Sequence, residues 1–213
     1  MDSDYKYFLI ISSLIVITLI MFTLFSSIVI IGERYFIPWE PPKKTYYHIF
    51  PAGGYKIISG FKKAGKGYYS LVSKKALVEF IVRGEYINES QTYAFIVYCT
   101  TPEKVEDFNP ALFAILDKVA DAMYKNNSDL LREASKIIEK SFPRELKAYI
   151  NIGISSTPLY VFEINPKETL RIPVVIEAPL GKVSKSYVIV FIMVGEVTEE
   201  GYSTSEMCLY ISP

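Results

Sequence analysis

The sequence is poor in the residues that carry most enzyme chemistry. Its 213 residues include one histidine, His48, and two cysteines, Cys99 and Cys208. Histidine is the commonest general base and a frequent metal ligand, so a single copy removes most acid–base and metal sites. A blue-copper centre needs two His and one Cys, which this chain cannot supply. We therefore expect no catalytic residue, no metal site and no cofactor.

An excess of charge of one sign is also lacking. The 23 Lys and Arg residues balance the 23 Asp and Glu residues, so the broad positive surface of a nucleic-acid-binding protein is not indicated. Side-chain amides are scarce, with Gln91 the single glutamine, whereas Lys, Glu and Ile are frequent. The charge balance leads us to expect no nucleic-acid partner. Because the amino-acid usage resembles that of hyperthermophile proteins, we also expect a thermophilic archaeal source.

The most informative segment present is a run of 26 residues without charge, Tyr7–Gly32. A helix of this length, rising ~1.5 Å per residue, crosses a ~30 Å hydrocarbon layer with some tilt. A cleavable signal peptide would have an apolar core of about 7–15 residues before its small-residue site, but here the chain stays apolar after Ser26-Ser27. We therefore expect a single membrane anchor, with the lipid bilayer as a partner.

The charged residues on either side of this anchor do not decide its orientation in the membrane. Lys6 precedes the run and Arg34, Lys43 and Lys44 follow it, which favours a cytoplasmic C-terminal part, although long domains translocate regardless of charge. Two sequons, beginning at Asn88 and Asn126, and the very short N-terminal tail favour the outside. We expect an extracytoplasmic domain with possible glycosylation at these two asparagines.

The chain divides into three parts. Residues 1–34 hold the N-terminal tail and transmembrane helix, residues 35–45 form a Pro-rich juxtamembrane linker, and residues 46–213 form the extracytoplasmic domain. The prolines that follow Ile37 disfavour a helix and predict a stiff, extended spacer. The remaining length suits one domain or two small ones.

Within residues 46–213, period-two alternation predicts strands. They are expected at about Tyr55–Phe61, Tyr68–Ser73, Ala76–Arg83, Thr92–Thr100, from Ala148 onward, and at Leu159–Ile164, Leu170–Glu177, Tyr187–Val194 and Thr204–Ile211. Pro173 lacks a ladder donor, which predicts an edge strand. Tyr187–Val194 is apolar on both faces and must therefore be covered twice.

Between the fourth and fifth of these predicted strands, after Thr100 and before Ala148, the period changes to that of a helix. Asn109 is a good N-cap with Pro110 at the first helical position, and apolar residues then recur at spacings of three and four. Asn126-Asn127 breaks the pattern and Ser128 caps a second helix. A helical hairpin at about 109–142 is the obvious cover for the second face of Tyr187–Val194. The fold class expected is mostly β (α+β).

Three segments near the end of the chain form a recurring pattern. Asn165–Val174 contains a P-x-E-T-L-x-I-P-V strand, Ala178–Gly181 is a Pro/Gly turn, and a Y-x-V-x-V strand begins with Tyr187–Val190. Over about thirty residues this resembles the closing strands of Ig-like or fibronectin-III-like modules in archaeal and bacterial surface proteins. The resemblance implies an Ig-like β-sandwich-type domain after the N-terminal transmembrane helix, with the helical hairpin as an insertion.

One motif suggests nucleotide binding but fails its context test. Gly60–Gly67 spells G-x-x-x-x-G-K, yet Gly67 stands where a Mg²⁺-binding hydroxyl belongs, and strand-like sequence follows. A phosphate loop requires that hydroxyl and a following helix, so we expect a Gly-rich hairpin turn and no nucleotide partner. The lysines around it form a basic patch that is either solvated or able to touch anionic lipid or a surface polymer.

The cysteines leave two alternatives. A bridge between Cys99 and Cys208 would close a long loop and stabilise by up to ~4–5 kcal/mol, but parity places Cys208 on the outward face of the last strand. A disulfide and two isolated thiols therefore both stay open. The acidic loops around Glu103 and Glu199 lack the calcium-loop pattern, so they are expected to be solvated.

Two classes of function remain. The preferred one is a non-enzymatic, single-pass, membrane-anchored extracytoplasmic module, acting in interactions at the cell surface or envelope or as an accessory subunit of a membrane complex. Its partners would be other membrane or surface-layer proteins. The alternative is a subunit of a respiratory or transport enzyme complex whose cofactors lie in partner chains.

Overall fold

The computed structural model describes residues 52–65, 67–106, 110–153 and 155–213. Residues 48–213 form a compact unit, distinct from residues 1–47. The predicted span Tyr7–Gly32, the linker at 35–45 and His48 lie outside the described residues. Within the described ranges, no helix combines the length and the apolar character that crossing a membrane requires.

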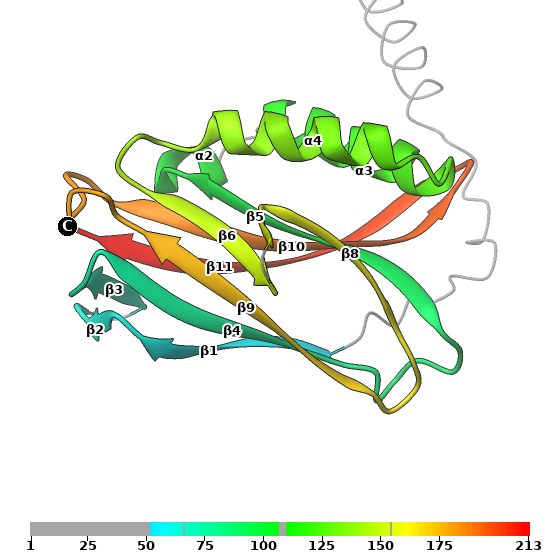
Figure 1. The fold of residues 1–213 in the computed structure, drawn as a ribbon, viewed down its shortest axis with the longest axis horizontal. Coiled ribbons are helices and arrows are strands. Elements are labelled where there is room, and N and C mark those ends of the chain that lie inside the picture. Colours follow the sequence, from blue (N-terminus) through cyan, green and yellow to red (C-terminus); the bar gives the residue numbers. More distant parts are fainter. Residues whose placement is uncertain (1–51, 66, 107–109, 154) are drawn as a thin grey trace, which may run out of the picture. The chain divides into compact units, whose positions relative to one another are not determined.

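Two β-sheets pack face to face (Figure 1). The first has the spatial order β1 (Ala52–Ser59), β4 (Lys75–Arg83), β9 (Thr169–Glu177), β6 (Lys147–Ile152) and β7 (Ser155–Thr157). The second has the order β2 (Phe61–Lys63), β3 (Tyr68–Leu71), β11 (Gly201–Ser212), β10 (Tyr187–Thr198), β5 (Gln91–Thr100) and β8 (Leu159–Ile164). The helices α2 (Pro102–Glu106), α3 (Pro110–Tyr124) and α4 (Ser128–Ser141) follow β5 along the chain. The prediction of a mostly β, two-sheet sandwich is confirmed.

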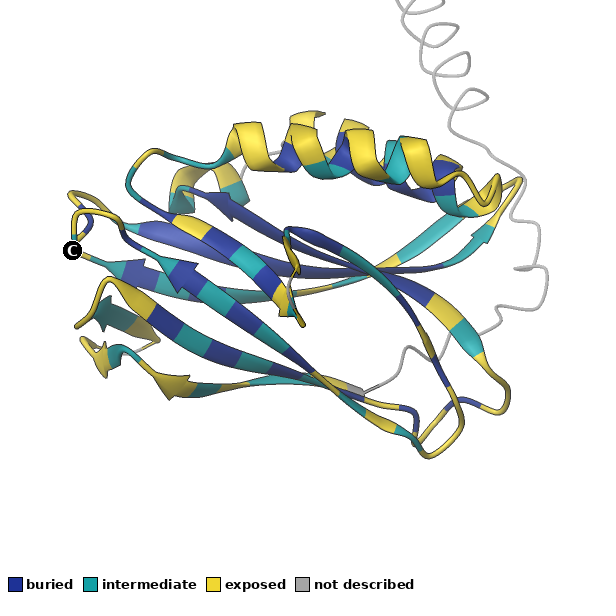
Figure 2. Cartoon of the chain, in the orientation of Figure 1, coloured by how far each residue is buried: buried dark blue, intermediate teal, exposed yellow. Residues whose placement is uncertain are grey.

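Alternate residues of the strands fill the core between the sheets. Burial alternates along β4 and β9 as the period-two pattern predicts (Figure 2). Phe95 of β5 lies at the centre of this core, with its ring centroid 4.5 Å from that of Phe80 and 6.1 Å from that of Phe191. Such aromatic pairs add to the stabilisation that comes from burial alone.

The second face of β10 is covered by the helical hairpin (Figure 1). Every residue from Tyr187 to Gly195 is buried. Four alternate side chains, Val188, Val190, Ile192 and Val194, join a hydrophobic cluster with buried residues of both long helices, among them Ile115, Val119, Ala134 and Ile138. The predicted double cover of this strand is confirmed, because a sandwich alone would leave one apolar face in water.

The two helices are joined by a turn with well-defined caps. At the end of α3, the Asn126 N–H donates to the Met123 carbonyl at 3.1 Å and the Asn127 N–H donates to the Ala122 carbonyl at 2.8 Å. This is the Schellman pattern, with Asn126 left-handed at φ 48°. The Asn127 side chain then accepts from the N–H groups of the next helix. The sequence pattern predicts Ser128 as this N-cap, which is one residue too late. The N-cap predicted for the first helix, Asn109, lies outside the described residues.

The prediction that Pro173 marks an edge strand is wrong. Strand β9 is paired on both sides, with β4 through all nine of its residues and with β6 from Glu177 back to Val174. Pairing with β6 thus stops one residue before Pro173 is reached. The proline is tolerated in a central strand because one of its two neighbours ends there.

Candidate functional site

The two cysteines lie on opposite faces of the six-stranded sheet. Cys99 on β5 faces the core between the sheets, whereas Cys208 on β11 packs against the cluster beneath the helices. Both are free thiols, and β10 lies between their strands, so the bridge considered from the sequence is not formed. Burial raises the pKa of the Cys99 thiol far above its usual range, which suppresses the reactive thiolate.

The two sequon asparagines are exposed and lie in different turns. Asn88 belongs to the connection between β4 and β5, and Asn126 to the turn between α3 and α4. In the first sequon, Ser90 donates a hydrogen bond to the Glu163 carboxylate. Glycosylation at either asparagine stays a prediction.

The Gly60–Gly67 segment is a hairpin, as the sequence predicts. Strands β2 and β3 pair antiparallel, and both terminal glycines have positive φ, 81° and 80°. A Cβ at Gly60 would lie 2.6 Å from the Ala76 Cα, so the chain requires glycine there. A strand therefore stands where a phosphate loop requires a helix. The absence of nucleotide binding stays a prediction.

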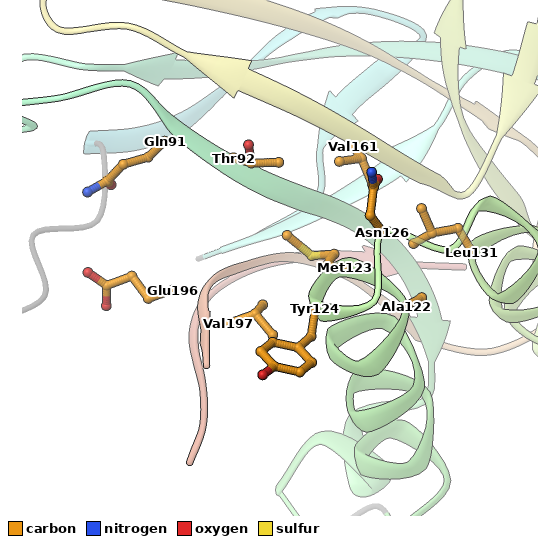
Figure 3. A pocket seen from close by; sticks show the side chains of 10 residues that line it. All are labelled: Gln91, Thr92, Ala122, Met123, Tyr124, Asn126, Leu131, Val161, Glu196 and Val197. Atoms are coloured by element: carbon orange, nitrogen blue, oxygen red, sulfur yellow. The ribbon is translucent and has the colours of Figure 1, made fainter. Parts of the chain in front are cut away.

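No group of three or more His, Cys, Asp and Glu side chains in the described ranges is arranged to hold a metal ion. The described residues also form a cleft that the sequence does not reveal. Its volume is about 470 Å³, and it opens where the end of α3 approaches the start of β5 and the end of β10 (Figure 3). One part of its lining is apolar: Met123, Leu131, Val161 and Val197. Another part is polar: Gln91, Thr92, Asn126 and Glu196.

A bulge in β10 builds one wall of the cleft. The pairing of β10 with β11 shifts register between Gly195 and Thr198, and Glu196 adopts φ 51°. A left-handed conformation at a residue other than glycine costs roughly 1–3 kcal/mol and is concentrated at functional sites. The bulge re-aims the chain at the end of the strand, and in Figure 3 the Glu196 carboxylate lies on the same side of the cleft as the Gln91 amide.

The bulge depends on close packing against one aromatic ring. A Cβ at Gly195 would lie 2.4 Å from Cε1 of Tyr93, so only glycine fits beside this buried ring. The Tyr93 hydroxyl donates to the Gln91 side-chain oxygen. Burial, together with the nearby charge of Glu196, raises the pKa of Tyr93 to about 12. Tyr93 therefore stays a neutral donor at all physiological pH values.

A second, shallower depression of about 400 Å³ lies next to the cleft, and Tyr124 and Val197 line both of them. The Tyr124 hydroxyl donates to the Glu199 carboxylate at 2.7 Å, and this bond raises the pKa of Tyr124. Similarly, the Tyr202 hydroxyl donates to Asp117 at 2.7 Å, and burial with this bond raises the pKa of Tyr202 to about 12. These bonds tie the β10–β11 turn to α3.

The combined lining of the two depressions is acidic. It includes four carboxylates, those of Asp121, Glu196, Glu199 and Glu200, and one ammonium group, that of Lys125. Because Lys125 is paired with Asp121 at 2.7 Å, the net charge near the opening is negative. An apolar wall beside carboxylates suits the long apolar stem and charged head of Lys or Arg.

Comparisons with known proteins add no family. No protein-family model matches the chain, and no curated protein matches it. The chain is similar to a FixG-related protein from Vibrio parahaemolyticus, with TM-score 0.34 and 10% identity over 77% of this chain and 97% of that chain. It is also similar to the periplasmic chaperone SfaE, with TM-score 0.33 and 9% identity over 75% and 57%. A third is ACE19, the collagen binding subdomain of the Enterococcus faecalis surface protein ACE, with TM-score 0.27 and 8% identity over 74% and 99%. At these scores none of the three carries an argument about this chain.

Proposed function

We propose that this chain is a non-enzymatic, single-pass membrane protein whose extracytoplasmic domain is an interaction module, at the cell surface or envelope or as an accessory subunit of a membrane complex. The uncharged run Tyr7–Gly32 has the length of a bilayer-spanning helix. Residues 48–213 are a separate compact unit, whose two hydrophobic clusters cover both faces of β10. A domain with its own complete core is suited to standing outside the bilayer on an anchor.

We also propose that the sandwich is Ig-like or fibronectin-III-like. The support is the sequence resemblance in Asn165–Val190, which covers β9, the following turn and the start of β10. The parallel pairing of β3 with β11 and the helical hairpin are additions to the simple module.

The observation that carries the interaction function is the acidic cleft at the end of α3. Its volume is sufficient for one or two side chains, and a strained residue, Glu196, lies in its wall. The occupant we propose is a segment of a partner protein that presents Lys or Arg next to an apolar residue. The cation would lie near Glu196 and the apolar side chain against Leu131 and Val161.

Site-specific photo-crosslinking in native membranes tests this proposal. A benzophenone side chain at Thr92, which is exposed and lines the cleft, should yield a defined crosslink. The partner peptide identified by mass spectrometry should contain Lys or Arg. The same probe at Ser156, exposed on β7, is the matched control and should not yield this product.

Reversing the charge of Glu196 provides a second test of the proposed occupant. Glu196→Lys should abolish the Thr92 crosslink, because it places a cation where the partner's cation would bind. Glu139→Lys, at an exposed position of α4 that does not line the cleft, should leave the crosslink intact. A crosslink that survives Glu196→Lys, or that maps to a peptide without a basic residue, would refute the proposed occupant.

A further inference from the structure

The two most exposed large hydrophobic side chains of the described residues are Leu180, 75% exposed, and Val72, 62% exposed. Leu180 lies in the turn between β9 and β10, and Val72 lies in the turn between β3 and β4. The turns are neighbours, because the Ala178 N–H donates to the Lys74 carbonyl at 2.9 Å. Both apolar tips therefore project from the same end of the sandwich.

The exposure of Leu180 is imposed by a loop that is anchored on both sides. Ala178 and Val183 are buried in the core between the sheets. Next to them, the Ser184 N–H and hydroxyl donate to the Glu145 carboxylate at 2.9 and 2.7 Å. Leu180 is thus presented to solvent by a fixed scaffold, which lowers the entropic cost of binding through it.

Lysines surround the two tips. The segments 72–75 and 178–186 contain four lysines, Lys74, Lys75, Lys182 and Lys185, and no acidic residue. The carboxylates that face them come from neighbouring elements. Glu177 pairs with Lys75 at 2.8 Å, Glu145 bonds Ser184, and Glu103 in α2 is close enough to feel the charge of Lys185. Lys147 lies opposite Glu177 on the next strand and adds a further cation.

We propose that this end of the sandwich binds an anionic lipid surface, inserting Leu180 and Val72 between headgroups while the lysines contact the phosphates. Two apolar side chains with lysines in the same turns match an anionic bilayer surface, in which negative headgroups overlie an apolar interior. This contact is additional to the anchor. The described part of β1 begins at the opposite end of the sandwich, where Ala52 pairs with Arg83.

The experiment uses the full chain in nanodiscs of phosphatidylcholine, mixed with vesicles of phosphatidylcholine with or without phosphatidylglycerol. Flotation should recover the chain with the phosphatidylglycerol vesicles only, and added salt should weaken the recovery. Each lysine at an anionic surface contributes roughly a fivefold gain in affinity, so Lys74→Gln and Lys182→Gln should each weaken binding about fivefold. Leu180→Ser should weaken it more than tenfold.

The matched control is Tyr86→Ser, which removes a side chain that is 59% exposed in the turn that follows β4, at the end away from Leu180. It should leave vesicle binding unchanged.

Insertion is measured with the Leu180→Trp variant and with brominated acyl chains that are present only in the vesicles. The bromines should quench the fluorescence of this variant but not that of the natural chain. No recovery, or recovery that Tyr86→Ser weakens as much as Leu180→Ser does, would overturn the proposal. Recovery without quenching of Leu180→Trp would refute insertion and leave an electrostatic contact with the headgroups alone. If the chain fails to enter nanodiscs, the membrane anchor is contradicted but the lipid contact at Leu180 is not. Vesicle binding would then be measured on the chain without nanodiscs.

Discussion

Replacing Ile138 by Ala tests whether the helical hairpin is part of the core. Ile138 on α4 is fully buried and belongs to the cluster that covers the second face of β10. Removing such a side chain costs the lost transfer free energy plus the cavity, about 2–5 kcal/mol. For a domain of this size each kcal/mol lowers the melting temperature by about 2–4 °C. The expected loss is therefore about 4–20 °C.

The neighbouring residue provides the control for this change. Ile137 is 38% exposed on the same helix, so Ile137→Ala removes the same atoms from the same local sequence but should cost about 0.5 kcal/mol or less. The assay is thermal or guanidinium unfolding followed by circular dichroism, on the full chain in mild detergent. If Ile138→Ala and Ile137→Ala unfold at the same midpoint, the hairpin is not core and the reasoning fails. Ile115→Ala on α3 gives an independent repeat of the test.

Three further predictions follow from single contacts. Gly195→Ala should destabilise by about 1–3 kcal/mol in chemical unfolding, because the new methyl overlaps the Tyr93 ring, and adding Tyr93→Ala should recover part of the loss; an additive double variant would contradict this. The hydrogen bonds from Ser184 hold the pKa of Glu145 below its ordinary value of about 4.3, so the ionised carboxylate stabilises the fold above that value and this contribution is lost as pH falls through the folded pKa. Glu145→Gln should therefore lower stability at neutral pH and reduce its dependence on pH in the acid range, whereas an unchanged acid profile would count against it. Calorimetric titration with ATP and Mg²⁺ should give no saturable heat from the Gly60–Gly67 segment, and a micromolar isotherm that Lys66→Ala abolishes would overturn that interpretation.

The position of the hairpin was accessible from the sequence because it follows from a local necessity. Tyr187–Val194 has no polar face, and an apolar strand with one sheet opposite it needs a second cover. The outward parity of Cys208 was accessible for the same reason, since alternation fixes the face on which each residue of a strand lies.

The central position of β9 and the cleft were not accessible. Pro173 predicts an edge when a strand is considered alone, but its tolerance depends on where the neighbouring β6 stops pairing. The cleft depends on a bulge after Gly195 and on where α3 ends. The one sequence signal was a glycine followed by charge at the end of an otherwise apolar strand, a pattern that also fits a simple strand end.

Protease accessibility in intact spheroplasts tests the central claim most directly. If Tyr7–Gly32 is a membrane span and the folded domain lies outside, protease added to intact spheroplasts should cleave residues 48–213 from the membrane. A tag before Lys6 should stay protected, and alkaline carbonate should leave the chain in the membrane fraction. Full protection of the domain until the spheroplasts are lysed would contradict the outside location, and release of the uncleaved chain by carbonate would contradict the anchor.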